Sequence, residues 1–171
     1  MKNYFPKVAA VVLCGLAVLA GSGALATPRA VEAFDARSWQ ALQVSLKQPT
    51  VVVFSATWCP TCPAAIEELA QDIRQRKLNA TLQAVVIDVA PGEKDTALMG
   101  QAHYRMTDRL FAFSGQAPAL RYIVDPKWRG ATPYVVFLTP GAPARVVTGP
   151  PTEDDIDAWV QLSARPVPKP R

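Results

Sequence analysis

Residues 50–76 constrain the fold most, because two cysteines lie there between a predicted strand and a predicted helix. Residues 50–54 form a short continuous apolar run, which is typical of a strand buried on both faces of a sheet. Cys59-Pro60-Thr61-Cys62 follows closely. Residues 63–76 then have apolar residues at helical spacing, and a proline in the first turn is compatible with a helix start. The segment therefore predicts a strand, a short turn that holds both cysteines, and a helix.

The remaining apolar patterns predict an α/β chain. Further strands are predicted at 82–89, 134–138 and 144–148, and further helices at 35–46, 96–106, 107–113 and 153–163, with a break at 114–118. Thr152 and Asp155 form a capping box for the last helix. Strand–helix–strand, a long crossover, a hairpin and a helix predict a central mixed β-sheet flanked by helices.

The N-terminal residues 1–26 have the pattern of a secretory signal peptide. Lys2 and Lys7 precede an unbroken apolar stretch, and Ala24-Leu25-Ala26 supplies a small-x-small cleavage pattern. The alternative is an uncleaved membrane anchor, because the uncharged stretch nearly reaches spanning length. We expect a linker at 27–34, a folded domain at 35–163 and a flexible proline-rich tail at 164–171. Both alternatives place the domain in an oxidising compartment, and we predict the periplasm.

Composition excludes two classes of protein. Half of the 171 residues are hydrophobic and the formal net charge is only +4, which argues against a disordered chain. Lysine and arginine are scattered without an aromatic–basic stripe, so nucleic acid is not an expected partner.

The cysteine spacing favours redox chemistry. Outside the leader the chain has only Cys59 and Cys62. A disulfide between them would close a tiny loop and restrain the unfolded chain little, so a structural staple is disfavoured. A zinc site needs four ligands, and one CxxC with a single histidine in the chain does not supply them. A structural CxxC without turnover is the less favoured interpretation.

Several motifs together resemble the thioredoxin superfamily across residues 35–163. They are Trp58-Cys59-Pro60-Thr61-Cys62, Ile87-Asp88 after a buried strand, Thr132-Pro133 before an apolar strand, and the hairpin with Gly149. Within the superfamily, the run from Ala56 to Cys62 is similar to the TlpA-type periplasmic reductases, including the cytochrome c maturation thioredoxins. The resemblance implies a thioredoxin fold with a long insert, at about 91–130, before the strand that follows a cis-proline.

The two cysteines have distinct expected roles. A thiolate at Cys59 would lie at a helix N-terminus, where unpaired N–H groups and the helix dipole stabilise it, so we expect an exposed, attacking Cys59. Cys62, one turn later, would resolve the mixed disulfide. Trp58, Pro60 and Thr61 are expected to support the site. Because Pro60 and Thr61 are neutral, whereas strongly oxidising relatives carry a histidine at the second of these positions, the motif favours a protein-disulfide reductase over an oxidase.

The resemblance also assigns substrate binding to Thr132 and Pro133. Pro133 matches the superfamily's cis-proline, which faces the cysteines and offers backbone to an extended substrate. An ordinary trans proline opening an edge strand is the alternative. Thr132 resembles the Thr-Pro pair of disulfide isomerases, which keeps an oxidase or isomerase as a second hypothesis.

The sequence departs from the superfamily pattern in two places. Val53 stands where thioredoxins have a buried acid that relays protons, so water or another acid, such as Glu67 or Glu68, must do this. The insert at 91–130 is longer than most connections. It would either shape the substrate groove or form a helical cover for the sheet edge.

A copper-delivery chaperone is the remaining alternative. Met99, His103 and Met106 have the spacing of one helix face and could supply soft ligands beside Cys59 and Cys62, although such stripes are more often core packing. The main prediction needs no bound metal or cofactor beyond a redox-active Cys59–Cys62 disulfide. The expected partners are protein thiols and disulfides and a membrane thiol protein that donates electrons, and the chain is expected to be a monomer.

Overall fold

The structure is a computed structural model that describes residues 27–164. The predicted signal peptide and nearly all of the predicted tail lie outside the described residues. Within 27–164, no helix is both long and apolar enough to span a bilayer.

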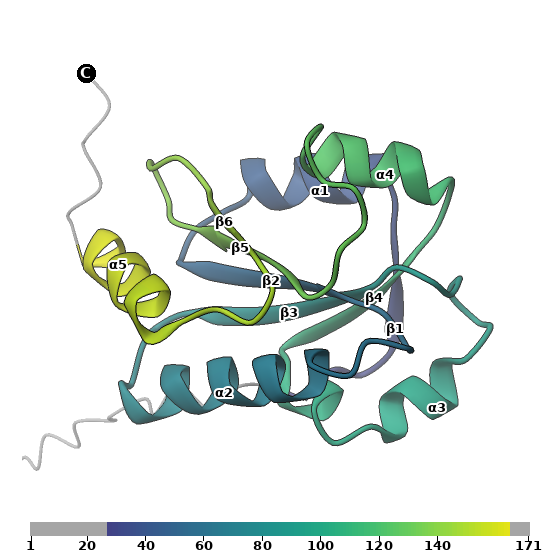
Figure 1. Cartoon of the computed structure of the whole chain (residues 1–171), viewed down its shortest axis with the longest axis horizontal. Coiled ribbons are helices and arrows are strands. Elements are labelled where there is room, and N and C mark those ends of the chain that lie inside the picture. The colour runs from purple at the N-terminus through teal and green to yellow at the C-terminus, as the bar shows by residue number, and fades with distance from the viewer. Residues whose placement is uncertain (1–26, 165–171) are drawn as a thin grey trace, which may run out of the picture.

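The chain forms one six-stranded mixed sheet with helices on both faces (Figure 1). In chain order the elements are β1 (Val31–Phe34), α1 (Ala36–Val44), β2 (Thr50–Ser55), α2 (Cys62–Gln75), β3 (Thr81–Val86), α3 (Asp95–Gly100), the 3-10 turn η1 (Tyr104–Met106), β4 (Arg109–Phe113), α4 (Ala117–Val124), β5 (Tyr134–Leu138), β6 (Arg145–Thr148) and α5 (Glu153–Ser163).

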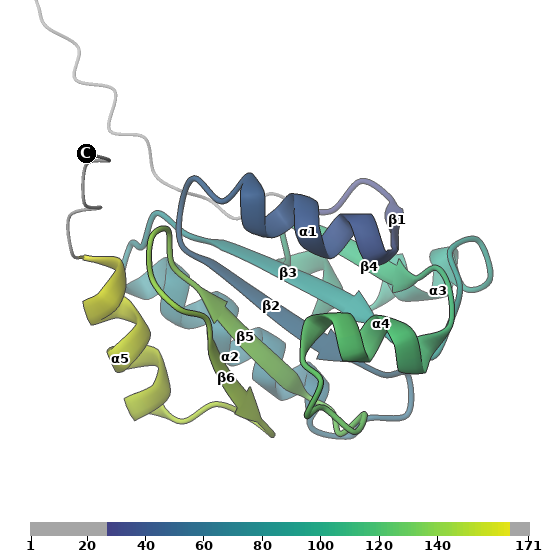
Figure 2. The ribbon, with the colours of Figure 1, turned by 90° about the horizontal axis from the view of Figure 1, so that it is seen from above.

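The sheet order is β1-β4-β3-β2-β5-β6, with the first four strands parallel and the last two joined to them by antiparallel pairing. Helices α1 and α4 lie on one face, and α2 and α3 lie on the other (Figures 1 and 2). Ile156 and Trp159 of α5 belong to the same buried group as the core residues of α2, so α5 packs on the α2 face. The predicted central mixed sheet flanked by helices is confirmed.

The sequence patterns with the strongest physical basis match the structure best. Strand β2 has all six residues buried, as the continuous apolar run predicts. Helix α5 begins after Thr152, whose side chain accepts a hydrogen bond from the Asp155 N–H, while the Asp155 carboxylate accepts one from the Thr152 N–H. The predicted capping box is therefore present.

Two predictions at the β1–β4 end of the sheet are wrong. Residues 31–34, expected to be linker, form β1. They pair with β4, about eighty residues later, and no local sequence pattern indicates that partner. Residues 107–113, expected to be helical, contain β4. A short apolar run does not distinguish helix from strand by period, and here the aromatic residues and the parallel partners on both sides favour the strand.

The insert at 91–130 is not simply the helical cover that was one of its two expected forms. It contributes α3, η1, β4 and α4, and its strand β4 lies inside the sheet between β1 and β3. The interpretation as a cover for the sheet edge is therefore wrong for this strand. Helix α4 begins within the predicted break, with Pro118 in its first turn, where a missing N–H costs nothing.

A group of aromatic side chains fills the core on the α1 and α4 face, with Phe54 of β2 at its centre. Phe54 is fully buried, and its ring lies 4.9 Å from that of Trp128 between ring centroids. The other rings packed on Phe54 are those of Phe34, Trp39, Phe113 and Tyr134. Elements from four parts of the chain therefore meet on one side chain close to the cysteines.

We predict that Phe54→Ala lowers the free energy of unfolding by about 3–5 kcal/mol, because it removes a buried ring and leaves a cavity among five others. Urea denaturation followed by circular dichroism measures this change. Val44→Ala, which truncates a side chain that is 83% exposed, should change the free energy by less than about 0.5 kcal/mol. Equal effects of the two substitutions would contradict the central role of Phe54.

Candidate functional site

The strand register brings the predicted site residues to one end of the sheet. Strand β2 pairs in parallel with β3 up to Ser55 and Val86, and in antiparallel with β5 at Phe54 and Tyr134. The chain that leaves β2 therefore runs beside the chain that leaves β3 and beside the residues that enter β5. As a result the cysteine loop, Asp88 and Thr132-Pro133 gather where β2 ends.

Cys59 and Cys62 form a disulfide at this end of the sheet. Cys62 is the first residue of α2, and Cys59 lies in the turn before the helix. Cys59 is 6% exposed and Cys62 is fully buried, so Cys59 is the more accessible of the two but is not the exposed residue we expected. The reason is packing, because both cysteines belong to the buried group that contains Phe54 and Trp128.

The residues around the disulfide are exposed and uncharged. The Trp58 side chain is 66% exposed, and Pro60 and Thr61 are also exposed. The Thr61 hydroxyl lies 3.9 Å from the Cys59 sulfur, a distance that a weak hydrogen bond to sulfur allows. Thr61 is also the residue that precedes the first turn of α2. Reduced Cys59 would thus face a hydroxyl and the positive end of a helix rather than a charged side chain.

Hydrogen bonds to Asp88 link the cysteine loop to the end of β3. Its carboxylate accepts hydrogen bonds from the Thr57 N–H, at 2.9 and 3.1 Å, and from the Thr57 hydroxyl at 2.5 Å. The Ile87 N–H donates to the Ser55 carbonyl, which continues the β2–β3 pairing by one residue. The sequence singled out Asp88 through its position after a buried strand but did not show its partner.

Thr132 and Pro133 lie at the start of β5, and the peptide bond between them is cis. The Gly149 N–H donates to the Pro133 carbonyl at 2.8 Å, which ties this turn to the end of the β5–β6 hairpin. The Thr132 hydroxyl is buried and has no hydrogen-bond partner within residues 27–164. A buried hydroxyl without a partner is uncommon, so it is a candidate for contact with a bound substrate.

The loop before Thr132 is held by two aromatic residues. The Trp128 ring stacks on the Tyr134 ring with centroids 4.4 Å apart, and its N–H donates to the Ala131 carbonyl. The Tyr134 hydroxyl donates to Asp125 at 2.5 Å. Burial and the Asp125 carboxylate raise the pKa of Tyr134, while the same hydrogen bond lowers the pKa of Asp125. A cavity of about 300 Å³ lies beside these residues, and Lys127 and Arg129 are on its wall.

A smaller cavity of about 150 Å³ opens directly on Cys59. One wall comes from β2 and the cysteine loop, and the other comes from the insert, through Leu98, Gln101, His103 and Tyr104. Ser55 and Tyr104 both line it, and their buried hydroxyls are hydrogen-bonded to each other at 2.9 Å. Sequence reasoning missed Ser55 and Tyr104, because nothing local to either residue indicates that they meet.

Two predicted features of the surroundings have clear outcomes. Val53 is fully buried in the apolar core, so this position supplies no titratable group near the cysteines. Helix α3 ends at Gly100, so Met99, His103 and Met106 do not share one helix face. Met99 and Met106 instead pack against the buried core, which removes the geometric basis of the copper hypothesis. Residues 27–164 contain no group of three or more His, Cys, Asp or Glu placed to hold a metal ion.

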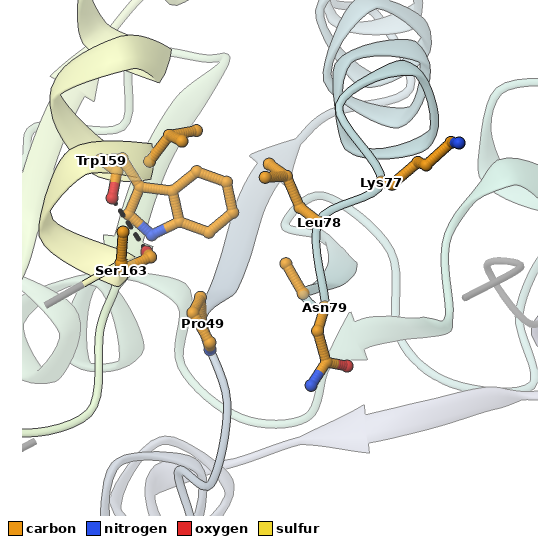
Figure 3. A pocket seen from close by; sticks show the side chains of 9 residues that line it. Pro49, Lys77, Leu78, Asn79, Trp159 and Ser163 are labelled. Atoms are coloured by element: carbon orange, nitrogen blue, oxygen red, sulfur yellow. Dashed lines mark hydrogen bonds between the residues drawn. The ribbon is translucent and has the colours of Figure 1, made fainter. Parts of the chain in front are cut away.

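A larger cavity, of about 320 Å³, lies at the opposite end of the sheet, where β2 and β3 begin (Figure 3). Pro49, Leu78 and Trp159 line it, together with Lys77, Asn79 and Ser163, and its wall is mostly apolar. It contains no side chain suited to thiol chemistry. The smaller cavity on Cys59 is therefore the one that bears on the candidate site.

Comparison with known proteins supports the fold. No protein-family model matches the sequence, and no curated protein matches it. The chain is similar to the thioredoxin domain of a thiol-disulfide oxidoreductase from Bacteroides vulgatus, at 13% identity and a TM-score of 0.50, covering 81% of this chain and 95% of that chain. It is also similar to StoA from Bacillus subtilis (14% identity, TM-score 0.48, 68% and 86% covered) and to a secreted disulfide oxidoreductase from Mycobacterium tuberculosis (18% identity, TM-score 0.45, 67% and 81% covered). Together with the sheet and helices described above, the match to the Bacteroides domain shows that this chain has the thioredoxin fold.

We predict that Thr61→Val slows the alkylation of reduced Cys59 by iodoacetamide about two- to tenfold at neutral pH, because the thiolate loses one hydrogen-bond donor. Thr61→Ser keeps the hydroxyl and should react at nearly the parent rate. The rate is measured in a Cys62→Ser background, so that a single thiol reacts. Equal rates for the valine and serine variants would contradict a role for the hydroxyl.

Proposed function

We propose that this chain is a thiol–disulfide oxidoreductase that reduces protein disulfides in the periplasm. The observation that carries the proposal is the Cys59–Cys62 disulfide, which spans a sequence separation of 3 at the junction of a buried strand and a helix. A bridge of this kind restrains the unfolded chain little, so stabilisation is a weak reason for it. Its place before a helix N-terminus instead suits a reactive thiolate.

The reaction follows from the two cysteine positions. The thiolate of reduced Cys59 attacks one sulfur of a substrate disulfide, forming a mixed disulfide and releasing the other substrate sulfur, which takes up a proton. Cys62 then loses its proton and attacks the Cys59 sulfur, which releases the second substrate thiol. The substrate has gained two electrons, and the Cys59–Cys62 disulfide has formed again. The exchange uses the two sulfurs and needs no further cofactor.

The substrate is proposed to dock across Trp58 and the turn at Thr132-Pro133. Trp58 offers an exposed apolar ring next to Cys59, and the Thr132 hydroxyl is buried without a partner within the described residues. Both features suit an extended protein segment that brings its own hydrogen bonds. We propose protein thiols and disulfides as partners, with no role for nucleic acid, and a single chain as the working unit.

The direction of transfer is proposed from the lack of charge around Cys59. Within the described residues, the hydrogen-bond partner of the Cys59 sulfur is the neutral Thr61 hydroxyl, and Pro60 adds no charge. A thiolate with modest stabilisation makes the dithiol a better electron donor, because a stable reduced form is what makes a strong oxidant. In the periplasm such a donor must be re-reduced, and a membrane thiol protein is the proposed source of electrons.

The first test of this function is catalytic. Cys59→Ser should abolish reduction of a protein disulfide such as that of insulin, because the attacking sulfur is lost. Cys62→Ser should stop at the mixed disulfide, which is observable as a covalent adduct by mass spectrometry. Full activity of the Cys59→Ser variant would refute the mechanism.

The second test concerns direction. Equilibration of the Cys59–Cys62 couple against glutathione gives its reduction potential, and we expect a value well below about −130 mV, the region of strong thiol oxidants. A value at or above that figure would favour an oxidase and leave the chemistry of the two cysteines unchanged.

A further inference from the structure

His103, the chain's one histidine, lies on the wall of the cavity that opens on Cys59. It precedes η1 in the insert and is partly buried. The cavity, of about 150 Å³, is large enough for several water molecules. Water filling this cavity would border His103 on one wall and Cys59 on the other.

The surroundings of His103 fix its position. Its ring lies 4.1 Å from the Tyr104 ring between centroids, and the Tyr104 hydroxyl is hydrogen-bonded to Ser55 at the end of β2. The histidine is thus attached through its neighbour to the strand that leads to the cysteines. This arrangement holds a titratable side chain in the lining of the cavity that Cys59 also lines.

We propose that His103 carries the proton during thiol–disulfide exchange at Cys59. The proposal rests on the function proposed above. In the first step the Cys59 thiol gives its proton to the imidazole, through water in the cavity, and becomes the thiolate. The thiolate attacks the substrate disulfide, and the bond between the two substrate sulfurs breaks. The imidazolium then returns the proton to the departing substrate sulfur, so that His103 ends as it began and no other reactant is consumed.

The other titratable groups that face this region are less suited to the task. Burial raises the pKa of Tyr104, which keeps its hydroxyl protonated. Asp88 already accepts three hydrogen bonds from Thr57. Glu67 of α2 acts on His103 from a distance, where its charge favours the imidazolium, but burial has the larger effect and lowers the pKa of His103. A mainly neutral imidazole can accept a proton briefly without adding a lasting positive charge beside Cys59, which agrees with the proposed reducing role.

The apolar core offers no proton carrier at position 53. Val53 is buried in the core and cannot exchange protons. The insert at 91–130 supplies one wall of the cavity, and His103 is part of that wall. The proposed proton carrier therefore belongs to the insert.

The test asks whether a small basic molecule restores the activity of a variant that lacks the imidazole side chain. His103→Ala should slow the reduction of insulin about a hundredfold, at the lower end of what general acid–base groups contribute. Added imidazole should restore much of the rate, whereas pyrrole, which has the same size but is not basic, should not. Asp154→Asn, which neutralises an exposed carboxylate on α5 that does not line the cavity, should keep the parent rate.

His103→Gln preserves most of the side-chain volume and should be as slow as the alanine variant, with a pH–rate profile that lacks the inflection of the parent. Parent-like rates in both variants, or equal rescue by imidazole and pyrrole, would overturn the proposal. Full activity of Cys59→Ser would instead overturn the proposed function, so the two failures are distinguishable.

Discussion

The burial of β2 on both faces is the constraint on which the rest of the structure depends. Six consecutive buried residues fix this strand at the centre of the sheet, and its two neighbours then have a single register each. That register decides which loops meet where β2 ends. The cysteine turn comes from β2 itself, the Asp88 anchor comes from β3, and Thr132-Pro133 comes from the chain that enters β5. The site is in this sense a consequence of strand pairing, and its side chains need few direct contacts with one another.

Much of this framework could be predicted because its signals are local. The apolar run at 50–54 needs a buried strand wherever it is placed, and the Thr152–Asp155 capping box is complete within four residues. The CxxC was recognisable for the same reason. By contrast, β1 pairs only with β4, and the apolar run at 107–113 becomes a strand because of partners on both sides. Tertiary pairing decides these elements, and a reading of local period cannot supply it.

The candidate site was predictable in its sulfur chemistry and not in its surroundings. The positions of Cys59, Cys62, Thr132 and Pro133 followed from motifs. The 6% exposure of Cys59 did not, since it depends on aromatic residues from distant segments that close around the disulfide. The cavity between β2 and the insert could not be predicted from local sequence either, because Ser55 and Tyr104, which line it, are 49 positions apart in the chain. Long-range packing therefore determines how the cysteines are approached, and local sequence determines what they can do.

The place of β4 in the sheet has a consequence for how the chain folds. β1 leaves the ribosome early, yet its partner in the sheet lies at Arg109–Phe113, and β3 also needs β4 along one of its sides. The sheet therefore cannot be completed in the order of synthesis, and the parallel edges of β1 and β3 stay open until the insert arrives. Such non-local parallel pairing is slow, and open edges in the meantime favour association with other chains. The segment that shapes the cavity at Cys59 is thus also the one that joins β1 to β3, so one wall of that cavity and the parallel part of the sheet are acquired together.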